Sequence, residues 1–240
     1  MTALPEQDLP GHALFARYAF PPNELGYCGP TGTNASELSA HASEFDGAWP
    51  YLRAIADAAG IVDPLDADVV RSYWVGGPLL EKVDPAGLLT QLRTAFTGQV
   101  TGLLDEIPAT PGVLAHHSFH VFVVYPWVRF LNRDPATPLR ILQDCRIRWG
   151  TVQSVEDENA VVTSRQLRFD GATLSLGDPQ AERVRWSKDG ISLTGAPSCG
   201  DTVSMHWDWL CGNLTDTDSA SLAAATRTTL DLVNAARAPT

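Results

Sequence analysis

The residue types best suited to metal or nucleophilic chemistry are cysteine and histidine. The four cysteines are widely spaced and form no CxxC pair: Cys28, Cys145, Cys199 and Cys211. In a reducing compartment such residues are free thiols, so one with a chemical role acts as a ligand or as a nucleophile. Cys145 and His206 each lie near the end of a short predicted strand, and each taken alone is more simply a buried core residue than a ligand. A thiolate and an imidazole held there would bind iron well.

A second candidate group is the histidine-rich part of the apolar segment 111–132, which we predict to be a buried helix. In a helix, His116 and His120 share a face, whereas His117 points about 100° away. An i, i+4 histidine pair can bind a metal or haem iron, although the glutamate of a zinc-protease HExxH motif is missing here. The alternative for these histidines is hydrogen bonding inside the core. Cys28 is likewise either a further ligand or a packed thiol in a tight turn.

Two sequence patterns divide the chain near residue 138. Apolar residues at helical spacing, interrupted by proline and glycine, predict helices over 5–20, 36–59, 66–73, 85–97 and 111–132, with a loop over 20–34. Short segments rich in Val, Ile, Thr and Trp then predict strands over 146–155, 160–167, 172–176, 183–186, 191–193 and 202–207. An Ala/Leu-rich helix over 219–236 follows. We therefore expect an α+β protein, with an all-α domain over 1–138 and a small β-barrel with a C-terminal helix over 139–240.

The charge balance narrows the class of protein. A formal net charge of -11 disfavours binding to nucleic acid or to an anionic membrane surface. The first residues show no cationic region followed by an apolar core, so no signal peptide is expected. The apolar run 119–125 is far shorter than the roughly 20 residues that a membrane-spanning helix needs. These features predict a cytoplasmic protein.

Two motifs in the second half resemble those of the HypC/HupF family of [NiFe]-hydrogenase maturation chaperones. The family begins C-x-x-[IV]-P-G and continues with a V-x-x-[IV] strand; this chain has CRIRWG at 145–150 and then TVQSV. The family's second motif is G-[DQ]-[WY]-V-[LI]-V-H, and this chain has GDTVSMH at 200–206. A C-terminal helix follows in both, so the resemblance covers roughly residues 144–236. Here Cys145 lies behind a whole domain, and Trp149 stands where the family has proline.

The resemblance implies both a fold and a cargo. The fold would be an oligomer-binding (OB) barrel, and Cys145 and His206 would transiently hold iron as an Fe(CN)2CO unit. The partner would be the hydrogenase large-subunit precursor or a HypD-like assembly factor, which makes the protein a metallochaperone rather than an enzyme. Bulky or charged residues around the two motifs are the candidates for partner binding: Arg146, Arg148, Trp149, Trp207 and Trp209.

The first half, with FPPNELGYCGP at 20–30 and HHSFHVF at 116–122, resembles an uncharacterised, mostly actinobacterial family associated with hydrogenase genes. Three hypotheses stay open: a hydrogenase-maturation chaperone, a metal- or haem-dependent enzyme using His116, His120 and Cys28, and a non-catalytic scaffold. A separation of about 4–6 Å between the ligand atoms of Cys145 and His206 would allow them to share one metal.

Overall fold

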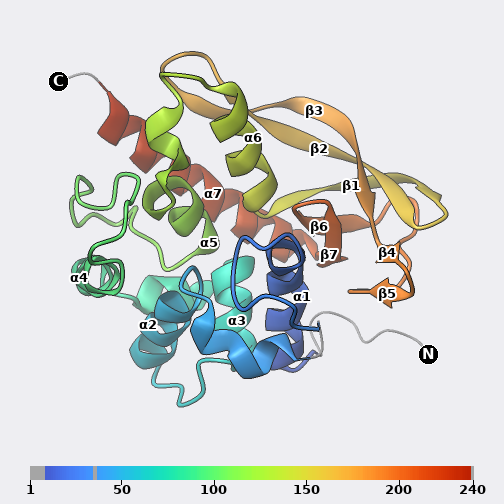
Figure 1. The fold of residues 1–240 in the computed structure, drawn as a ribbon, viewed down its shortest axis with the longest axis horizontal. Coiled ribbons are helices and arrows are strands. Elements are labelled where there is room, and N and C mark those ends of the chain that lie inside the picture. Colours follow the sequence, from blue (N-terminus) through green and yellow to red (C-terminus); the bar gives the residue numbers. More distant parts are fainter. Residues whose placement is uncertain (1–8, 35–36, 239–240) are drawn as a thin grey trace.

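The computed structural model describes residues 9–34 and 37–238 (Figure 1). Its first half is built from short helices: α1 (Gly11–Glu24), η2 (Leu38–Glu44), α2 (Trp49–Ala59), α3 (Ala67–Trp74), η3 (Pro78–Lys82) and α4 (Pro85–Ala95). Local sequence sets several of their ends. Side chains of Asp66 and Asp84 accept backbone N–H groups at the starts of α3 and α4. Gly60, in the left-handed conformation at φ 71°, closes α2.

Helix α1 extends through Pro21 and Pro22, where the sequence predicted the start of a loop. Both prolines are buried near the end of the helix. The loop that follows is folded back by Asn23, whose Nδ2 donates to the carbonyl oxygens of Cys28 (2.9 Å) and Pro30 (2.7 Å). This buried amide therefore determines where Cys28 lies.

The segment 111–132 was predicted as a helix that is kinked or ends near Pro126. The break at Pro126 is present, but the prediction of one continuous helix before it was wrong, because the segment forms three short pieces. They are α5 (His117–Phe119), a π-helical turn η4 (His120–Val124) and a 3-10 turn η5 (Pro126–Phe130). His116 is extended, with φ -125° and ψ 150°, and its Nδ1 accepts the Ser118 N–H as an N-cap. A helix that starts at His117 and widens at His120 changes which histidines share a face.

The second half contains a closed five-stranded barrel in the order β1-β2-β3-β7-β6. Its strands are β1 (Arg148–Glu156), β2 (Asn159–Phe169), β3 (Leu174–Arg185), β6 (Thr202–His206) and β7 (Trp209–Asn213). All neighbouring strands are antiparallel except β3 and β7, which are parallel. A small hairpin, β4 (Ser187–Lys188) and β5 (Ile191–Ser192), lies between β3 and β6. The predicted α+β architecture, with helices followed by a barrel and a C-terminal helix, is confirmed at this level.

Strand β3 joins two segments that the sequence predicted as separate strands. Gly177 and Pro179 lie inside it and suggested a break. The pairing of β2 with β3 is irregular between Arg165 and Leu167, and Pro179 lies opposite Arg165 at this point. Such an irregularity accommodates a residue that has no backbone N–H to donate.

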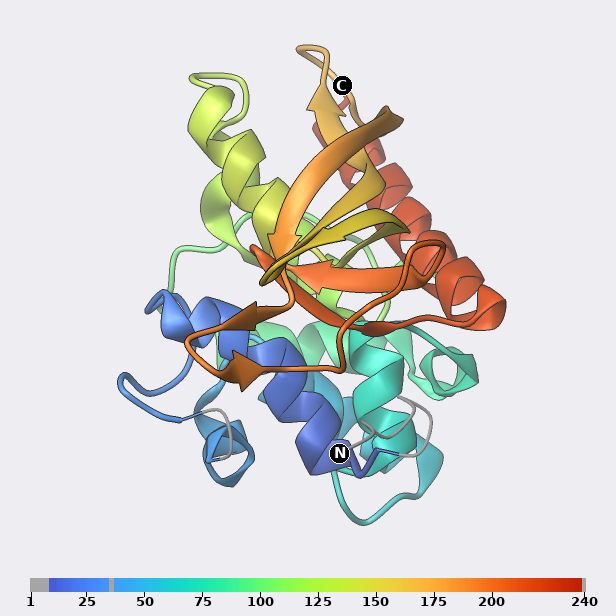
Figure 2. The same ribbon diagram turned by 90° about the vertical axis from the view of Figure 1, so that its right-hand side faces the viewer.

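Helices α6 (Ala136–Cys145) and α7 (Asp216–Arg237) connect the two halves and flank the barrel (Figure 2). The domain boundary predicted at residue 138 falls inside α6. One hydrophobic core runs across this boundary and includes residues from the first helices, from the hairpin after β6 and from α7. A capping box formed by Thr215 and Asp218 starts α7. Within the described residues, no helix is long and apolar enough to cross a membrane.

Candidate metal centre

The pairing of β1 with β6 brings Cys145 and His206 together. The two strands are antiparallel, and Arg148 at the start of β1 lies opposite Met205 near the end of β6. Cys145 is the last residue of α6, just before β1, and His206 is the last residue of β6. A backbone hydrogen bond of 2.8 Å from Trp207 N to the carbonyl oxygen of Asp144 holds the end of β6 beside the end of α6.

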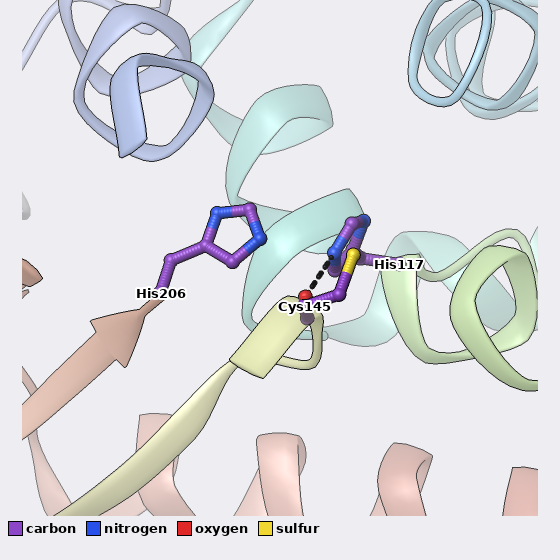
Figure 3. A group of neighbouring side chains, drawn as sticks. All are labelled: His117, Cys145 and His206. Carbon is purple, nitrogen blue, oxygen red and sulfur yellow. Dashed lines mark hydrogen bonds between the residues drawn. The ribbon is translucent and has the colours of Figure 1, made fainter. Parts of the chain in front are cut away.

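His117 reaches the same point from the helical half. Its ligand atom and those of Cys145 and His206 all lie within 4.8 Å of one another, and all three residues are buried. Figure 3 shows the His117 ring beside the Cys145 side chain, with the His206 ring facing both across a gap. The separation of the predicted pair thus falls in the range that allows a shared metal, and a third ligand joins them.

His206 is held in the protonation state that a metal ligand needs. Its Nδ1 lies 2.7 Å from the carbonyl oxygen of Tyr18, which can only accept a hydrogen bond, so Nδ1 carries the proton. Nε2 is buried and has no hydrogen-bond partner among the described residues. Burial, and then the neighbouring His117, hold the pKa of His206 well below its usual 6.5, so the ring is neutral. A metal-binding histidine commonly has this arrangement, with one nitrogen donating to a carbonyl and the other free.

His117 belongs to a hydrogen-bond chain that is one proton short. Tyr73 Oη contacts the carbonyl oxygen of Gly47 and lies 2.9 Å from His117 Nδ1, and His117 Nε2 lies 2.8 Å from the carbonyl oxygen of Cys145. Both ends of the chain are carbonyl oxygens, which only accept, so three links need three protons. A phenol and a neutral imidazole supply two. A charged imidazole would supply the third, but burial lowers the pKa of His117 to about 4.

The Cys145 thiol is protonated in the metal-free protein. Burial is the main cause that raises its pKa well above 9, and the negative charge of Asp144 acts in the same direction. A buried thiol of this kind is a poor nucleophile. It becomes a good ligand when a metal ion displaces its proton.

His117, Cys145 and His206 line a largely buried cavity of about 20 Å³, together with Tyr73 and Trp74. A single water-sized occupant needs roughly 10–15 Å³. The cavity therefore has room for one ion or one water molecule, and little more.

The turn after His206 is strained. Trp207 has φ 51°, in the left-handed region that a bulky side chain rarely adopts. Its ring stacks on Tyr27 at a centroid distance of 4.4 Å, and its carbonyl oxygen accepts a hydrogen bond from the buried Arg148. Arg148 is in turn paired with Glu182 at 3.1 Å. These contacts hold the end of β6, and with it the His206 ring, in one position.

The other predicted site residues lie around this centre. His116 caps α5, and His120 and Cys28 line the far side of the cavity. Arg146 is buried and donates to Gln143 and to the carbonyl oxygen of Arg165. Trp209 is also buried, and its Nε1 donates to Glu24, whereas Trp149 is partly buried. These arginine and tryptophan side chains contact the folded chain itself.

Two side chains of this candidate centre, His117 and Tyr73, were not predicted from the sequence. His117 was set aside because a regular helix would direct it away from His116 and His120. The signal that could have identified it was Ser118, which lies two residues after His116 and lets that histidine cap a new helix start. Nothing local in the sequence marks Tyr73, since its role depends on contacts with residues 26 and 44 positions away.

A family model described as a family of unknown function (DUF6390) matches residues 7–240 of this chain. No curated protein and no solved structure matches it. The family therefore spans the helical half and the barrel together.

Proposed function

Since the chain belongs to the DUF6390 family along almost its whole length, we propose that it is a metal-binding accessory protein. His117, Cys145 and His206 would hold one first-row transition-metal ion in transit to a partner. The observation that carries this proposal is the convergence of three buried ligand atoms within 4.8 Å. Thiolate and imidazole together suit iron, zinc and their neighbours, and three protein ligands leave a position open for exchange.

The proton count around His117 supports a bound ion. If Nε2 binds a metal, it no longer needs a proton for the carbonyl oxygen of Cys145. The proton then sits on Nδ1 and is donated to Tyr73 Oη, whose own hydrogen is donated to the carbonyl oxygen of Gly47. Both remaining hydrogen bonds then have a proton. Without a metal, one of the three hydrogen-bond links around His117 has none. His206 already presents a free Nε2.

The spacing fits an ion after a small contraction. Metal–sulfur and metal–nitrogen bonds of about 2.3 and 2.1 Å place two ligands at most roughly 4.4 Å apart. Ligand atoms at the 4.8 Å limit must therefore move together by a few tenths of an ångström or more. The His117 ring can make this movement when it releases the Cys145 carbonyl oxygen, which lies 2.8 Å away.

The barrel topology supports the more specific proposal of a HypC-like chaperone. A closed five-stranded barrel is the framework of OB folds, and Cys145 before β1 and His206 at the end of β6 occupy the positions that the HypC resemblance implies. In this proposal the cargo is iron, and the partner is the hydrogenase large-subunit precursor or a HypD-like factor. The protein would act in the cytoplasm.

The cavity volume separates two forms of that cargo. Three diatomic ligands need about 30–45 Å³ beyond the metal, counted as three water-sized spaces. The largely buried cavity of about 20 Å³ suits an ion alone. An Fe(CN)2CO unit would require the cavity to open, and a haem bound through His116 and His120 would need still more space. The geometry thus favours a simple ion in the closed state.

Anaerobic titration of the purified, reduced protein with Fe²⁺ and Co²⁺ tests the proposal. We expect one ion per chain, with a thiolate charge-transfer band for Co²⁺ that disappears in Cys145→Ala. Cys211→Ala, which removes another buried thiol outside the cavity, is the matched control and should keep the band. A wild-type protein that binds neither ion would overturn the proposal and leave the scaffold hypothesis. Infrared bands of cyanide and carbonyl in protein isolated from cells would identify the diatomic form of the cargo.

A further inference from the structure

A surface cleft of about 340 Å³ lies beside the buried cavity. Four residues line both spaces: Cys28, Gly47, His120 and Tyr125. We call these four residues the shared wall. The shared wall lies between the cleft and the three candidate ligands in the cavity. An ion that enters from the cleft therefore passes these four residues.

Two members of the shared wall carry atoms that bind transition metals. The His120 ring lies next to His117, at a centroid distance of 6.4 Å. Cys28 lines both the cleft, which Asp46 also lines, and the cavity that Cys145 lines. Thiol and imidazole donors thus occur both in the wall and in the buried site.

Gly47 keeps His120 accessible. A Cβ on Gly47 would lie 2.8 Å from His120 Nε2, closer than side chains pack. Tyr51 Oη lies 3.4 Å from the other ring nitrogen, Nδ1, so Nε2 is the nitrogen at the Gly47 side. The carbonyl oxygen of Gly47 accepts the Tyr73 hydroxyl that continues to His117. One glycine therefore touches both the wall histidine and the support of the buried ligand.

The cleft has the charge that a cation route needs. Glu44 and Asp46 line it and are exposed, on a protein of net charge -11. Carboxylates at a cleft raise the local concentration of cations. Moving an ion from water to a buried site in one step has a large desolvation cost. Donors placed part-way allow water to be replaced one ligand at a time.

We propose that the cleft is the route by which the metal ion reaches the buried site, with Cys28 and His120 binding it transiently on the way. This inference rests on the proposed function. The cations that fit are borderline first-row ions such as Fe²⁺, Co²⁺ and Zn²⁺, because a thiol and an imidazole discriminate against Mg²⁺ and Ca²⁺. When Cys28 binds the ion, its proton passes to water in the cleft. When the ion moves on to Cys145, the proton released by the Cys145 thiol restores the Cys28 thiol.

Stopped-flow loading of the reduced full chain with Co²⁺ tests the route, with the thiolate band as the signal. The rate constant for Co²⁺ loading of Cys28→Ser should be about tenfold lower than that of wild type. Its final stoichiometry and equilibrium affinity should stay within about threefold of wild type. The exposed Asp46→Asn should also load more slowly, and the difference should shrink at high salt because exposed charges are screened. Cys199→Ser, an exposed thiol that lies against Gln153, is the matched control.

The outcomes separate the route from the site. If wild type binds Co²⁺ and neither variant loads more slowly than Cys199→Ser, the route is wrong and the metal site stands. If Cys28→Ser loses affinity as severely as Cys145→Ser, Cys28 is a resident ligand, and the idea of transient binding is wrong. If wild type binds no Co²⁺, the proposed function and the route fail together. Circular dichroism of each variant establishes that the rates are measured on folded protein.

Discussion

The barrel interior and the seam between barrel and helices are both closed to solvent, yet their contents differ. The barrel strands bury an aliphatic cluster, with a separate polar group of Arg148, Ser164 and Glu182 beside it. The aliphatic cluster consists of Val152, Ala160, Val162, Val184, Val203, Met205 and Leu210. The seam, which we define by the cavity-lining residues His117, Cys145, His206, Tyr73 and Trp74, is rich in groups that titrate or form hydrogen bonds. Neither region is exposed, so burial alone does not explain the difference.

The contrast indicates a division of labour. Aliphatic packing makes the barrel a stiff frame that fixes the start of β1 beside the end of β6. In the seam each buried polar atom needs a partner, and the unpaired His206 Nε2 and the proton-deficient chain at His117 do not have one in the metal-free protein. In the proposed function, the frame supplies position and the seam supplies the ligand atoms. Four predictions test this separation, from the largest expected effect to the smallest.

The largest effect should be acid sensitivity of the metal-free protein. Burial lowers the pKa of His116 and His120 to about 3 and that of His117 to about 4. The unfolded chain therefore binds more protons below pH 6.5, and stability falls as pH drops from 6.5 toward 4. Each histidine costs about 1.4 kcal/mol per pH unit in that window. His206, whose pKa is also well below 6.5, is a fourth, so the four together cost about 5–6 kcal/mol at pH 5.5. Urea unfolding with a chelator at pH 7.0 and 5.5 measures it.

A control and a contrary result complete this test. His120→Phe should remove about a quarter of the pH dependence, in proportion to one histidine of four. His41→Gln, at a partly exposed ion pair with Glu44, should leave most of it. If the unfolding free energy is the same at both pH values, the buried histidines accept protons in the folded state. That result would contradict a closed seam.

Next in size is the loss of a ligand from the seam. Cys145→Ser keeps the shape of the side chain and replaces a soft sulfur with a hydroxyl, so Co²⁺ affinity should fall by more than about a hundredfold. Cys211→Ser makes the same exchange at a buried thiol outside the cavity and should change affinity by less than about threefold. Isothermal titration of both variants gives the comparison. Equal losses would mean that the effect comes from the fold rather than from ligation.

The barrel interior should respond in the opposite way. Val162→Ala removes buried methyl groups from a fully buried position and should cost about 2 kcal/mol of unfolding free energy. The Co²⁺ affinity of the folded variant should stay within about threefold of the wild-type value, because the strands of the barrel keep their register. If affinity instead falls together with stability, the barrel interior and the seam are one cooperative unit, and the proposed division is wrong.

The smallest of the four effects concerns the support of His117. Tyr73→Phe deletes the hydroxyl between the Gly47 carbonyl oxygen and His117 Nδ1, and should weaken Co²⁺ binding about tenfold, as is typical for partners of a metal ligand. Tyr18→Phe is the matched control, because His206 uses the backbone carbonyl oxygen of Tyr18 and not its hydroxyl. Titrations that give equal affinities for the two variants would remove the proton-count argument.

Much of the barrel and part of the centre could be predicted from sequence. Strand-like segments, their turn residues and the capped C-terminal helix are encoded locally, and the Cys145 and His206 motifs lie at the ends of such segments. The strand pairing that joins this pair is long-range, but it follows once the barrel closes. The predicted pair therefore comes together in the fold, with ligand atoms within 4.8 Å.

His117 could not be predicted in the same way. Its direction depends on where the helix begins, and α5 starts late because His116 is extended and caps it. The turn is held from the other end of the chain, since Ser118 Oγ lies 2.8 Å from Thr229 Oγ1 in α7. Helical periodicity assumes a continuous helix, so it assigned the wrong rotational phase to all three histidines of this segment.

The contact between Ser118 and α7 can form only after α7, the last helix of the chain, has been synthesised. His117 leaves the ribosome 89 residues before His206 (206 − 117 = 89). At about 5–20 residues per second, this is a delay of about 4–18 s, and α7 follows later still. The nascent chain therefore exposes its histidine-rich segment before the thiol, the second imidazole or the anchoring helix exists. In the proposed function, the ion is therefore bound only after the whole chain has been made.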